Sequence, residues 1–84
     1  MATLNITVLF FAELAELCQT RQASLACEDG ATIDDLFDQL IALHPVVRDK
    51  RSTVATAVNE HYVDSTYTLQ DGDAVALIPP VSGG

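Results

Sequence analysis

One segment with the spacing of an amphipathic helix, residues 32–44, most limits what this chain of 84 residues can fold into. Its apolar residues fall on one side of such a helix, at Ile33, Leu36, Phe37, Leu40, Ile41 and Leu43. Thr32 is a favourable N-cap, and Asp35 three residues later makes an acidic variant of the capping box. Pro45 disfavours helical geometry at His44 and ends the helix there. The segment therefore predicts one main helix that needs a partner layer to cover its apolar side.

Three aspartates lie in the first two turns of this predicted helix, at Asp34, Asp35 and Asp38. A paired-carboxylate catalytic site would use residues of this type. The positive end of the helix dipole and a solvated helix face account for them with fewer assumptions. We therefore interpret the aspartates as structural.

The segments around the main helix are typical of strands, because they are rich in β-branched and aromatic residues and the first alternates apolar with polar positions. We predict strands at residues 4–11, 22–27, 54–58, 62–63 and 74–78. Residues 12–18 have the spacing of a short helix, whereas the polar and basic residues 46–53 indicate a loop. This order predicts an α+β domain, with the main helix packed on one face of a sheet. The first and last strands are the most apolar, so we expect both in the middle of the sheet.

Twelve acidic and four basic residues give the chain a net charge of −8. Nucleic acid is not an expected partner, because phosphate binding needs a concentrated basic surface. The acidity indicates either partners that present positive charge or a role in solubility alone, and the sequence leaves both open. No apolar run is long enough to cross a bilayer, and the N-terminus lacks the basic region of a secretory signal. We expect a soluble, cytoplasmic protein that does not bind membranes.

The residues that most often bind metals are scattered, since Cys18, Cys27, His44 and His61 form no cluster of short spacing. We therefore predict no metal site. The two cysteines are able to form one disulfide, but in a cytoplasmic chain they more often act as small buried apolar residues.

The unusual feature is the stretch after the last strand, which reads Pro-Pro-Val-Ser-Gly-Gly at residues 79–84. Extended, it reaches about 20 Å, enough to enter a deep pocket on another protein. Pro79 and Pro80 stiffen the start of this arm, while Gly83 and Gly84 fit a narrow channel and leave the terminal carboxylate sterically open. Adenylation would activate that carboxylate, and a sulfur nucleophile would convert it to a thiocarboxylate. A frayed end without function is the alternative.

Residues 69–84, which read Leu-Gln-Asp-Gly-Asp-Ala-Val-Ala-Leu-Ile-Pro-Pro-Val-Ser-Gly-Gly, resemble the C-terminal signature of the small subunits of molybdopterin synthase. Leu-Phe-Phe-Ala at residues 9–12 and Ala-Val-Asn at residues 57–59 fall where that family has similar motifs. The resemblance covers essentially the whole chain. It implies a ubiquitin-like β-grasp domain over residues 1–78, with a mixed sheet, one main helix on one face and a flexible Gly-Gly tail over residues 79–84.

The resemblance also implies a role as a sulfur carrier in molybdenum cofactor biosynthesis, not as an enzyme by itself. An adenylyltransferase related to ubiquitin-activating enzymes would use ATP to adenylate Gly84, which then carries sulfur as a thiocarboxylate; no cofactor is bound stably. Two small and two large subunits would form the synthase, and the tail residues Pro79, Pro80, Val81, Ser82, Gly83 and Gly84 would enter the active site of the large subunit. There the sulfur would pass to the pterin precursor.

A hydrophobic docking patch for that large subunit corresponds to Phe11, Tyr62 and Ile78, although the sequence alone leaves all three, and Phe11 above all, equally able to be core residues. Two alternatives stay open: a related sulfur carrier for thiamine, cysteine or tRNA thiolation, and a ubiquitin-like protein modifier. Ile78-Pro-Pro-Val-Ser before the two glycines favours the molybdopterin carrier. Lys50 is the only lysine, which argues against long lysine-linked chains of this protein.

Overall fold

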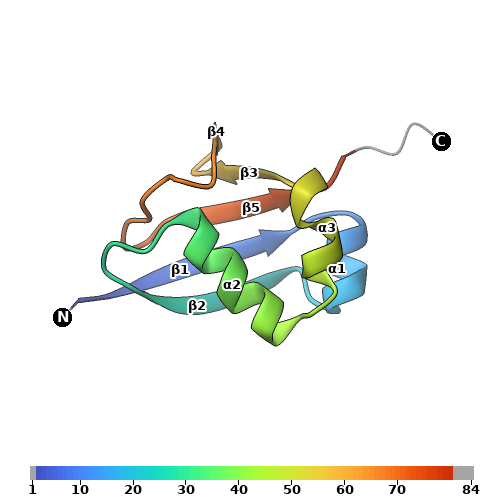
Figure 1. The fold of residues 1–84 in the computed structure, drawn as a ribbon, viewed down its shortest axis with the longest axis horizontal. Coiled ribbons are helices and arrows are strands. Elements are labelled where there is room, and N and C mark those ends of the chain that lie inside the picture. The colour runs from blue at the N-terminus through green and yellow to red at the C-terminus, as the bar shows by residue number, and fades with distance from the viewer. Residues whose placement is uncertain (1, 81–84) are drawn as a thin grey trace.

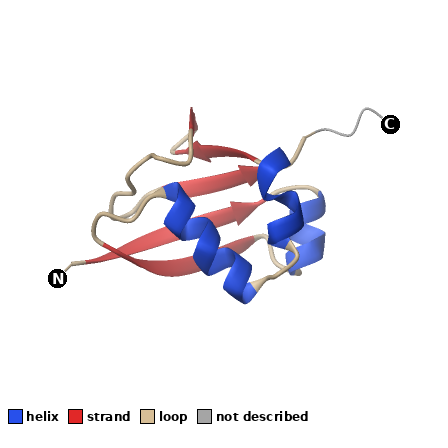
Figure 2. Cartoon of the chain, in the orientation of Figure 1, coloured by secondary structure: helices blue, strands red, loops and turns tan. Residues whose placement is uncertain are grey.

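The computed structural model describes residues 2–80 and consists of one twisted sheet with helices packed against it (Figures 1 and 2). Residue 1 and residues 81–84 lie outside the described part. The elements in chain order are β1 (Thr3–Phe10), α1 (Glu13–Cys18), β2 (Gln22–Glu28), α2 (Ile33–Leu43), α3 (Val47–Lys50), the 3₁₀ helix η1 (Arg51–Thr53), β3 (Ala55–Val58), β4 (His61–Val63) and β5 (Ala74–Ile78). None of the helices within residues 2–80 has the length and apolar character needed to cross a membrane.

The sheet has the strand order β2-β1-β5-β3-β4 and is mixed. Strand β1 is antiparallel to β2 and parallel to β5, whereas β5 and β4 are both antiparallel to β3. The register of the parallel pair places Thr7 opposite Ala74 and Phe10 opposite Leu77. The predicted interior position of β1 and β5 is confirmed, and so is the α+β arrangement of one main helix on one face of a sheet.

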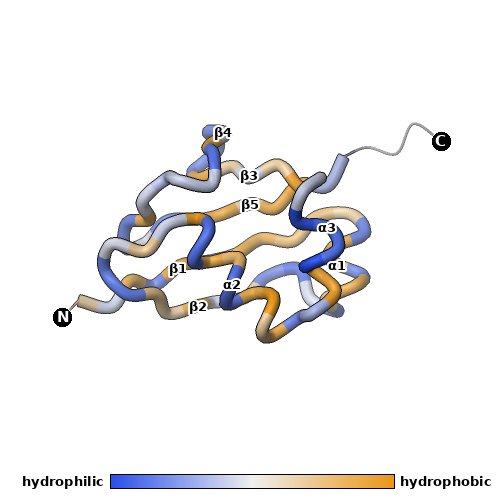
Figure 3. The backbone as a smooth tube through the Cα atoms, viewed as in Figure 1, coloured by the Kyte–Doolittle hydropathy of each residue, from blue (hydrophilic) through white to orange (hydrophobic). Residues whose placement is uncertain are grey.

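The core lies between the sheet and α2. Alternate residues of β1 are buried because successive side chains of a strand point to opposite faces. They meet the buried side of α2, where Leu36 and Leu40 are fully enclosed. The residues of these two elements and of β5 that make this core are Leu4, Ile6, Val8, Phe10, Ile33, Leu36, Phe37, Leu40, Val75 and Leu77. Figure 3 shows the hydrophobic positions running along the central strands.

Helix α2 begins and ends as its sequence indicates. The Thr32 side chain accepts a hydrogen bond from the Asp35 N–H at 3.4 Å, and the Asp35 carboxylate accepts one from the Thr32 N–H at 2.9 Å. This is the predicted capping box, and it satisfies two backbone donors that the helix leaves free. Leu43 was expected on the buried side, but it is 60% exposed. That prediction was wrong because the last turn of α2 lies past the edge formed by β2 in the view of Figure 1.

The predicted loop over residues 46–53 is also wrong, since α3 and η1 occupy it. The chain turns helical there because Val47 is fully buried and its N–H donates to the His44 carbonyl at 2.9 Å. Arg51 then forms ion pairs with Asp34 and Asp38 of α2. The polar residues of this segment favoured a loop in the sequence analysis. In the structure, Arg51 is held against α2 by Asp34 and Asp38, a contact that the local sequence does not report.

Candidate functional site

The face of the sheet that does not meet the core carries a row of apolar residues. In β1, Leu9 lies opposite Ala76 of β5, and Ala76 lies opposite Ala57 of β3. Ala57 in turn pairs with Tyr62 of β4. Because directly paired residues of neighbouring strands point to the same face, these side chains share the face opposite the core, although Ala57 itself is buried. Tyr62 is 73% exposed, which makes it the most prominent apolar surface on this face.

A second row of apolar residues lies next to the first, toward the end of β5. Ile78 pairs with Ala55 of β3. Phe11 directly follows Phe10, which pairs with Leu77, so Phe11 falls at the register position beside Ile78. We name the two rows together the apolar patch, which consists of Leu9, Phe11, Ala55, Ala57, Tyr62, Ala76 and Ile78.

The apolar patch contains all three residues that the resemblance assigned to partner docking. Phe11 is 46% exposed, so it lies on the surface and not in the core. Ile78 is half-buried and lies in the row next to that of Tyr62. The structure thus places Phe11, Tyr62 and Ile78 on one face, and their role in docking stays a prediction.

The arm predicted at residues 79–84 starts at the same end of the sheet as the apolar patch. Strand β5 ends at Ile78, Pro79 is buried, and Pro80 is exposed. Because β1 and β5 are parallel, Phe11 and Ile78 lie at the same end of the sheet, where the chain leaves it (Figure 1). The predicted site residues Val81, Ser82, Gly83 and Gly84 lie outside the described residues.

The turn that follows β1 has a strained backbone. Ala12 has φ 51° and ψ −130°, a conformation that residues with a Cβ rarely adopt. The turn is held by two hydrogen bonds, from the Leu14 N–H to the Phe11 carbonyl and from the Ala15 N–H to the Ala12 carbonyl, both at 3.1 Å. The strained residue therefore lies directly after Phe11, at one corner of the apolar patch.

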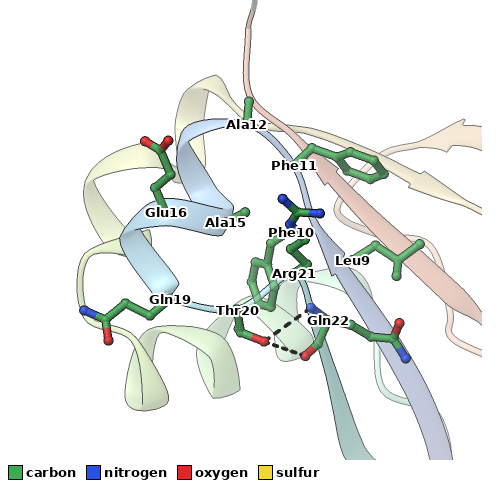
Figure 4. Close-up of a pocket in the computed structure, with 10 residues that line it drawn as sticks. All are labelled: Leu9, Phe10, Phe11, Ala12, Ala15, Glu16, Gln19, Thr20, Arg21 and Gln22. Carbon is green, nitrogen blue, oxygen red and sulfur yellow. Dashed lines mark hydrogen bonds between the residues drawn. The ribbon is translucent and has the colours of Figure 1, made fainter.

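Beside this turn lies an open hollow with a volume of about 760 Å³ (Figure 4). Its apolar walls come from the end of β1 and from α1, and its polar wall comes from the segment that leads into β2. The residues that line the hollow include the apolar Leu9, Phe11, Ala12 and Ala15 and the charged Glu16 and Arg21. No sequence pattern predicts this hollow, because it forms only where the ends of three elements meet.

The two cysteines are buried and unpaired in the structure, as expected of small apolar residues. Burial raises the pKa of both the Cys18 and the Cys27 thiols above the ordinary value of 9.0, so the nucleophilic thiolate form is disfavoured. Within residues 2–80, no three His, Cys, Asp or Glu side chains come together in a way that could hold a metal ion. The distinctive features of the described residues are thus the apolar patch and the buried Pro79 that directly follows β5.

The five-stranded mixed sheet with a central last strand, covered on one face by one main helix, is the ubiquitin-like β-grasp fold. A solved structure of small archaeal modifier protein 1 from Haloferax volcanii superposes with a TM-score of 0.85 at 28% identity, over 95% of this chain and 99% of that one. The putative molybdopterin converting factor subunit 1 of Pyrococcus furiosus gives a TM-score of 0.84, also at 28% identity, over 93% of this chain and 99% of that one.

Comparison of the sequence with known families identifies one family within this fold class. The ThiS family model matches residues 8–84, and the chain belongs to that family. Within it, the chain is 40% identical over 83 residues to the molybdopterin synthase sulfur carrier subunit of Chlamydomonas reinhardtii. That alignment covers 96% of this chain and 100% of the relative.

Proposed function

We propose that this protein carries sulfur in molybdenum cofactor biosynthesis, as the sulfur carrier subunit of molybdopterin synthase. The observation that carries this proposal is the 40% identity over 83 residues to a relative of that name, whose full length is covered. The family match also extends through residue 84, where the proposed chemistry takes place.

The geometry of residues 2–80 supports the delivery of an arm from a fixed point. Strand β5 is paired on both sides, with β1 and with β3, so hydrogen bonds to two neighbours hold its end on the sheet. Pro79 is buried directly after this strand, and proline limits the conformations open to the residues that leave the sheet. An arm with a rigid start loses less conformational entropy when it enters a partner's pocket.

The working group is the carboxylate of Gly84. A free carboxylate is a poor acyl donor, so a partner adenylyltransferase attaches AMP from ATP to it and releases pyrophosphate. A sulfide-level nucleophile then attacks the carbonyl carbon and expels AMP. A carbon–sulfur bond replaces a carbon–oxygen bond with no change in oxidation state, which leaves a thiocarboxylate. Transfer of that sulfur to the pterin precursor and addition of water restore the carboxylate.

The apolar patch is the surface that binds the large subunit. Exposed aromatic residues such as Tyr62 and Phe11 are the type that dominates binding energy when a partner covers them. The large subunit supplies the catalytic groups, and two small and two large subunits form the synthase. The carrier needs no cofactor of its own, and its two unpaired cysteines suit the reducing cytoplasm.

A second candidate function is that of a protein modifier, and the likeness to small archaeal modifier protein 1 favours it. In that case an amine of a target protein, in place of a sulfur nucleophile, attacks the activated Gly84. Covalent adducts of this chain in a cell lysate, resistant to boiling in detergent, would identify this function. Adducts that disappear when Gly84 is deleted would place the bond at that residue.

The test of the carrier function is the mass of the C-terminal peptide after incubation with ATP, the cognate adenylyltransferase and a sulfur donor. We expect a gain of about 16 Da, the difference between sulfur and oxygen. Oxidation of Met1 adds nearly the same mass, so the gain must be located in the peptide that contains Gly83 and Gly84. A variant with one residue added after Gly84 is the control, and we expect no gain at the displaced glycine. No gain in the unaltered chain, with an active adenylyltransferase, would overturn the proposal.

A further inference from the structure

We propose that the hollow beside the apolar patch receives an apolar side chain of the large synthase subunit, and that Arg21 binds a carboxylate next to that side chain. This inference rests on the proposed function and adds a specific anchor point to it. It predicts that the large subunit carries an apolar residue and an acidic residue side by side.

The hollow has the apolar lining that a partner's apolar side chain needs. It is open to solvent, and its walls at Leu9, Phe11, Ala12 and Ala15 are apolar. In Figure 4 the guanidinium of Arg21 lies between the wall residues, near Phe11. An apolar group that enters would lose contact with water, and any charge beside Arg21 would be partly shielded as well.

Arg21 is a basic residue of the hollow that has no acidic partner among residues 2–80. Of the four basic residues, Arg51 pairs with Asp34 and Asp38, and Lys50 pairs with Glu13. Neither Arg21 nor Arg48 has an ion pair among residues 2–80, and only Arg21 lines the hollow.

The Glu16 carboxylate also lines the hollow but forms no ion pair with Arg21 in the described part of the chain. The guanidinium therefore keeps its donors free for a partner. Its planar fork matches the two oxygens of a carboxylate, which favours that anion as the bound group.

The charge of the whole chain makes this contact specific. With a net charge of −8, the protein repels acidic surfaces at a distance, so an acidic residue on the partner is unfavourable everywhere except beside an exposed cation. A single charge pair at the rim of an apolar contact thus sets the orientation of the partner.

The large subunit is the occupant because the hollow is continuous with the apolar patch. Leu9 and Phe11 belong to both surfaces, so a partner that covers Phe11 lies against a wall of the hollow. Pro79 and Pro80, the first residues of the arm, follow β5 at the same end of the sheet, so the hollow, the apolar patch and the start of the arm lie close together.

The test compares two charge reversals in the full chain. Arg21→Glu changes the cation at the hollow, and Arg48→Glu makes the same change at an exposed position on α3. The dissociation constant with the purified cognate large subunit is measured by calorimetry at two salt concentrations. We expect Arg21→Glu to weaken binding by at least about tenfold and Arg48→Glu to leave it within about twofold. Arg21→Lys, which keeps the charge but loses the planar fork, should fall between them.

Three results would overturn the inference. Equal effects of the two reversals would show that only net charge matters. If Arg21→Glu lost binding to the adenylyltransferase but kept binding to the large subunit, the hollow would belong to the adenylyltransferase interface. If Arg21→Glu instead abolished a self-associated form seen in sedimentation, the hollow would bind a second copy of this chain. If the unaltered chain itself does not bind the large subunit, the proposed function fails together with this occupant. Circular dichroism of each variant checks the fold, and the backbone hydrogen bond from Phe10 to the Arg21 carbonyl does not depend on the side chain.

Discussion

Asn59 donates a hydrogen bond from its side-chain amide to the Asp73 carboxylate at 2.9 Å, and its own side-chain oxygen accepts one from the Ala74 N–H at 3.1 Å. Asn59 lies in the turn between β3 and β4, where its φ is 49°, and Asp73 directly precedes β5. The pair therefore fastens a turn of one hairpin to the start of the central strand. Asp73 also accepts from the Tyr67 hydroxyl at 3.2 Å and the Gln70 N–H at 2.9 Å, so its buried charge is well compensated.

Asp73→Ala should destabilise the fold strongly, because it leaves the partners of a buried carboxylate without an acceptor. We expect the free energy of unfolding to fall by about 2–3 kcal/mol. Urea denaturation measures the change, with Asp49→Ala at an exposed position as the control. A combined Asn59→Ala and Asp73→Ala variant should lose less than the sum of the single changes, since both remove the same bond. Full additivity would contradict this coupling.

Ala12→Gly should stabilise the protein, because glycine adopts the Ala12 backbone conformation without strain. Relief of about 1–3 kcal/mol exceeds the cost of about 0.5–1 kcal/mol for the added freedom of glycine in the unfolded chain. We expect a net gain of about 1 kcal/mol in chemical denaturation. Ala15→Gly, inside α1, is the matched control and should cost about 1 kcal/mol. A loss of stability in Ala12→Gly would show that the turn is not strained.

The thiols of Cys18 and Cys27 should not react in the folded protein. Burial raises their pKa and also blocks access, so Ellman's reagent at pH 8 should modify neither thiol until denaturant is added. Rapid reaction of either thiol under native conditions would contradict the described burial.

The same pKa shift makes the stability of the fold depend on alkaline pH. A folded-state pKa above the ordinary 9.0 means that the protonated thiol favours the folded state. Its contribution is present below pH 9 and is lost as the pH rises through the folded-state pKa. The free energy of unfolding should therefore fall more steeply above pH 9 than in a variant with both cysteines changed to alanine.

Tyr62→Ala should weaken binding to the large subunit without weakening the fold. Tyr62 is 73% exposed, so its loss should change the free energy of unfolding by no more than about 0.5 kcal/mol. An aromatic residue buried by a partner is worth enough that we expect the dissociation constant to rise about tenfold or more. Leu43→Ala is the control, because Leu43 is also a large hydrophobic residue on the surface, 60% exposed, but lies on α2, outside the apolar patch. Equal binding by the two variants would remove the patch from the interface.

The order of elements was predictable from local signals. The capping residues Thr32 and Asp35 mark where α2 begins, and Pro79 marks the end of β5. Helices α3 and η1 were missed because their main tertiary contacts, such as that of Arg51 over the Phe37 ring at 5.1 Å, join distant parts of the sequence. No local pattern reports such contacts.

The parts of the site that follow from the alternation of side chains along a strand were predictable from the sequence. The parts that form where the ends of different elements pack together were not. The alternation of apolar and polar residues in β1 predicts one buried face and one open face of the sheet, and the resemblance named Phe11, Tyr62 and Ile78 as patch residues. The exposure of Phe11 depends on the turn at Ala12, and the place of Arg21 depends on how α1 and β2 meet. Both needed the packed structure.

The central position of β5 has a consequence for synthesis of the chain. Strands β1 and β3 do not pair with each other; each pairs with β5, which the ribosome makes after both. Pairing between such distant segments is slow, because a long loop must close before any contact forms. A product of interrupted translation that ends before residue 74 leaves two open strand edges and exposed core residues, which are features of a substrate for degradation. Incomplete chains should therefore be cleared and not compete for the partners of the finished protein.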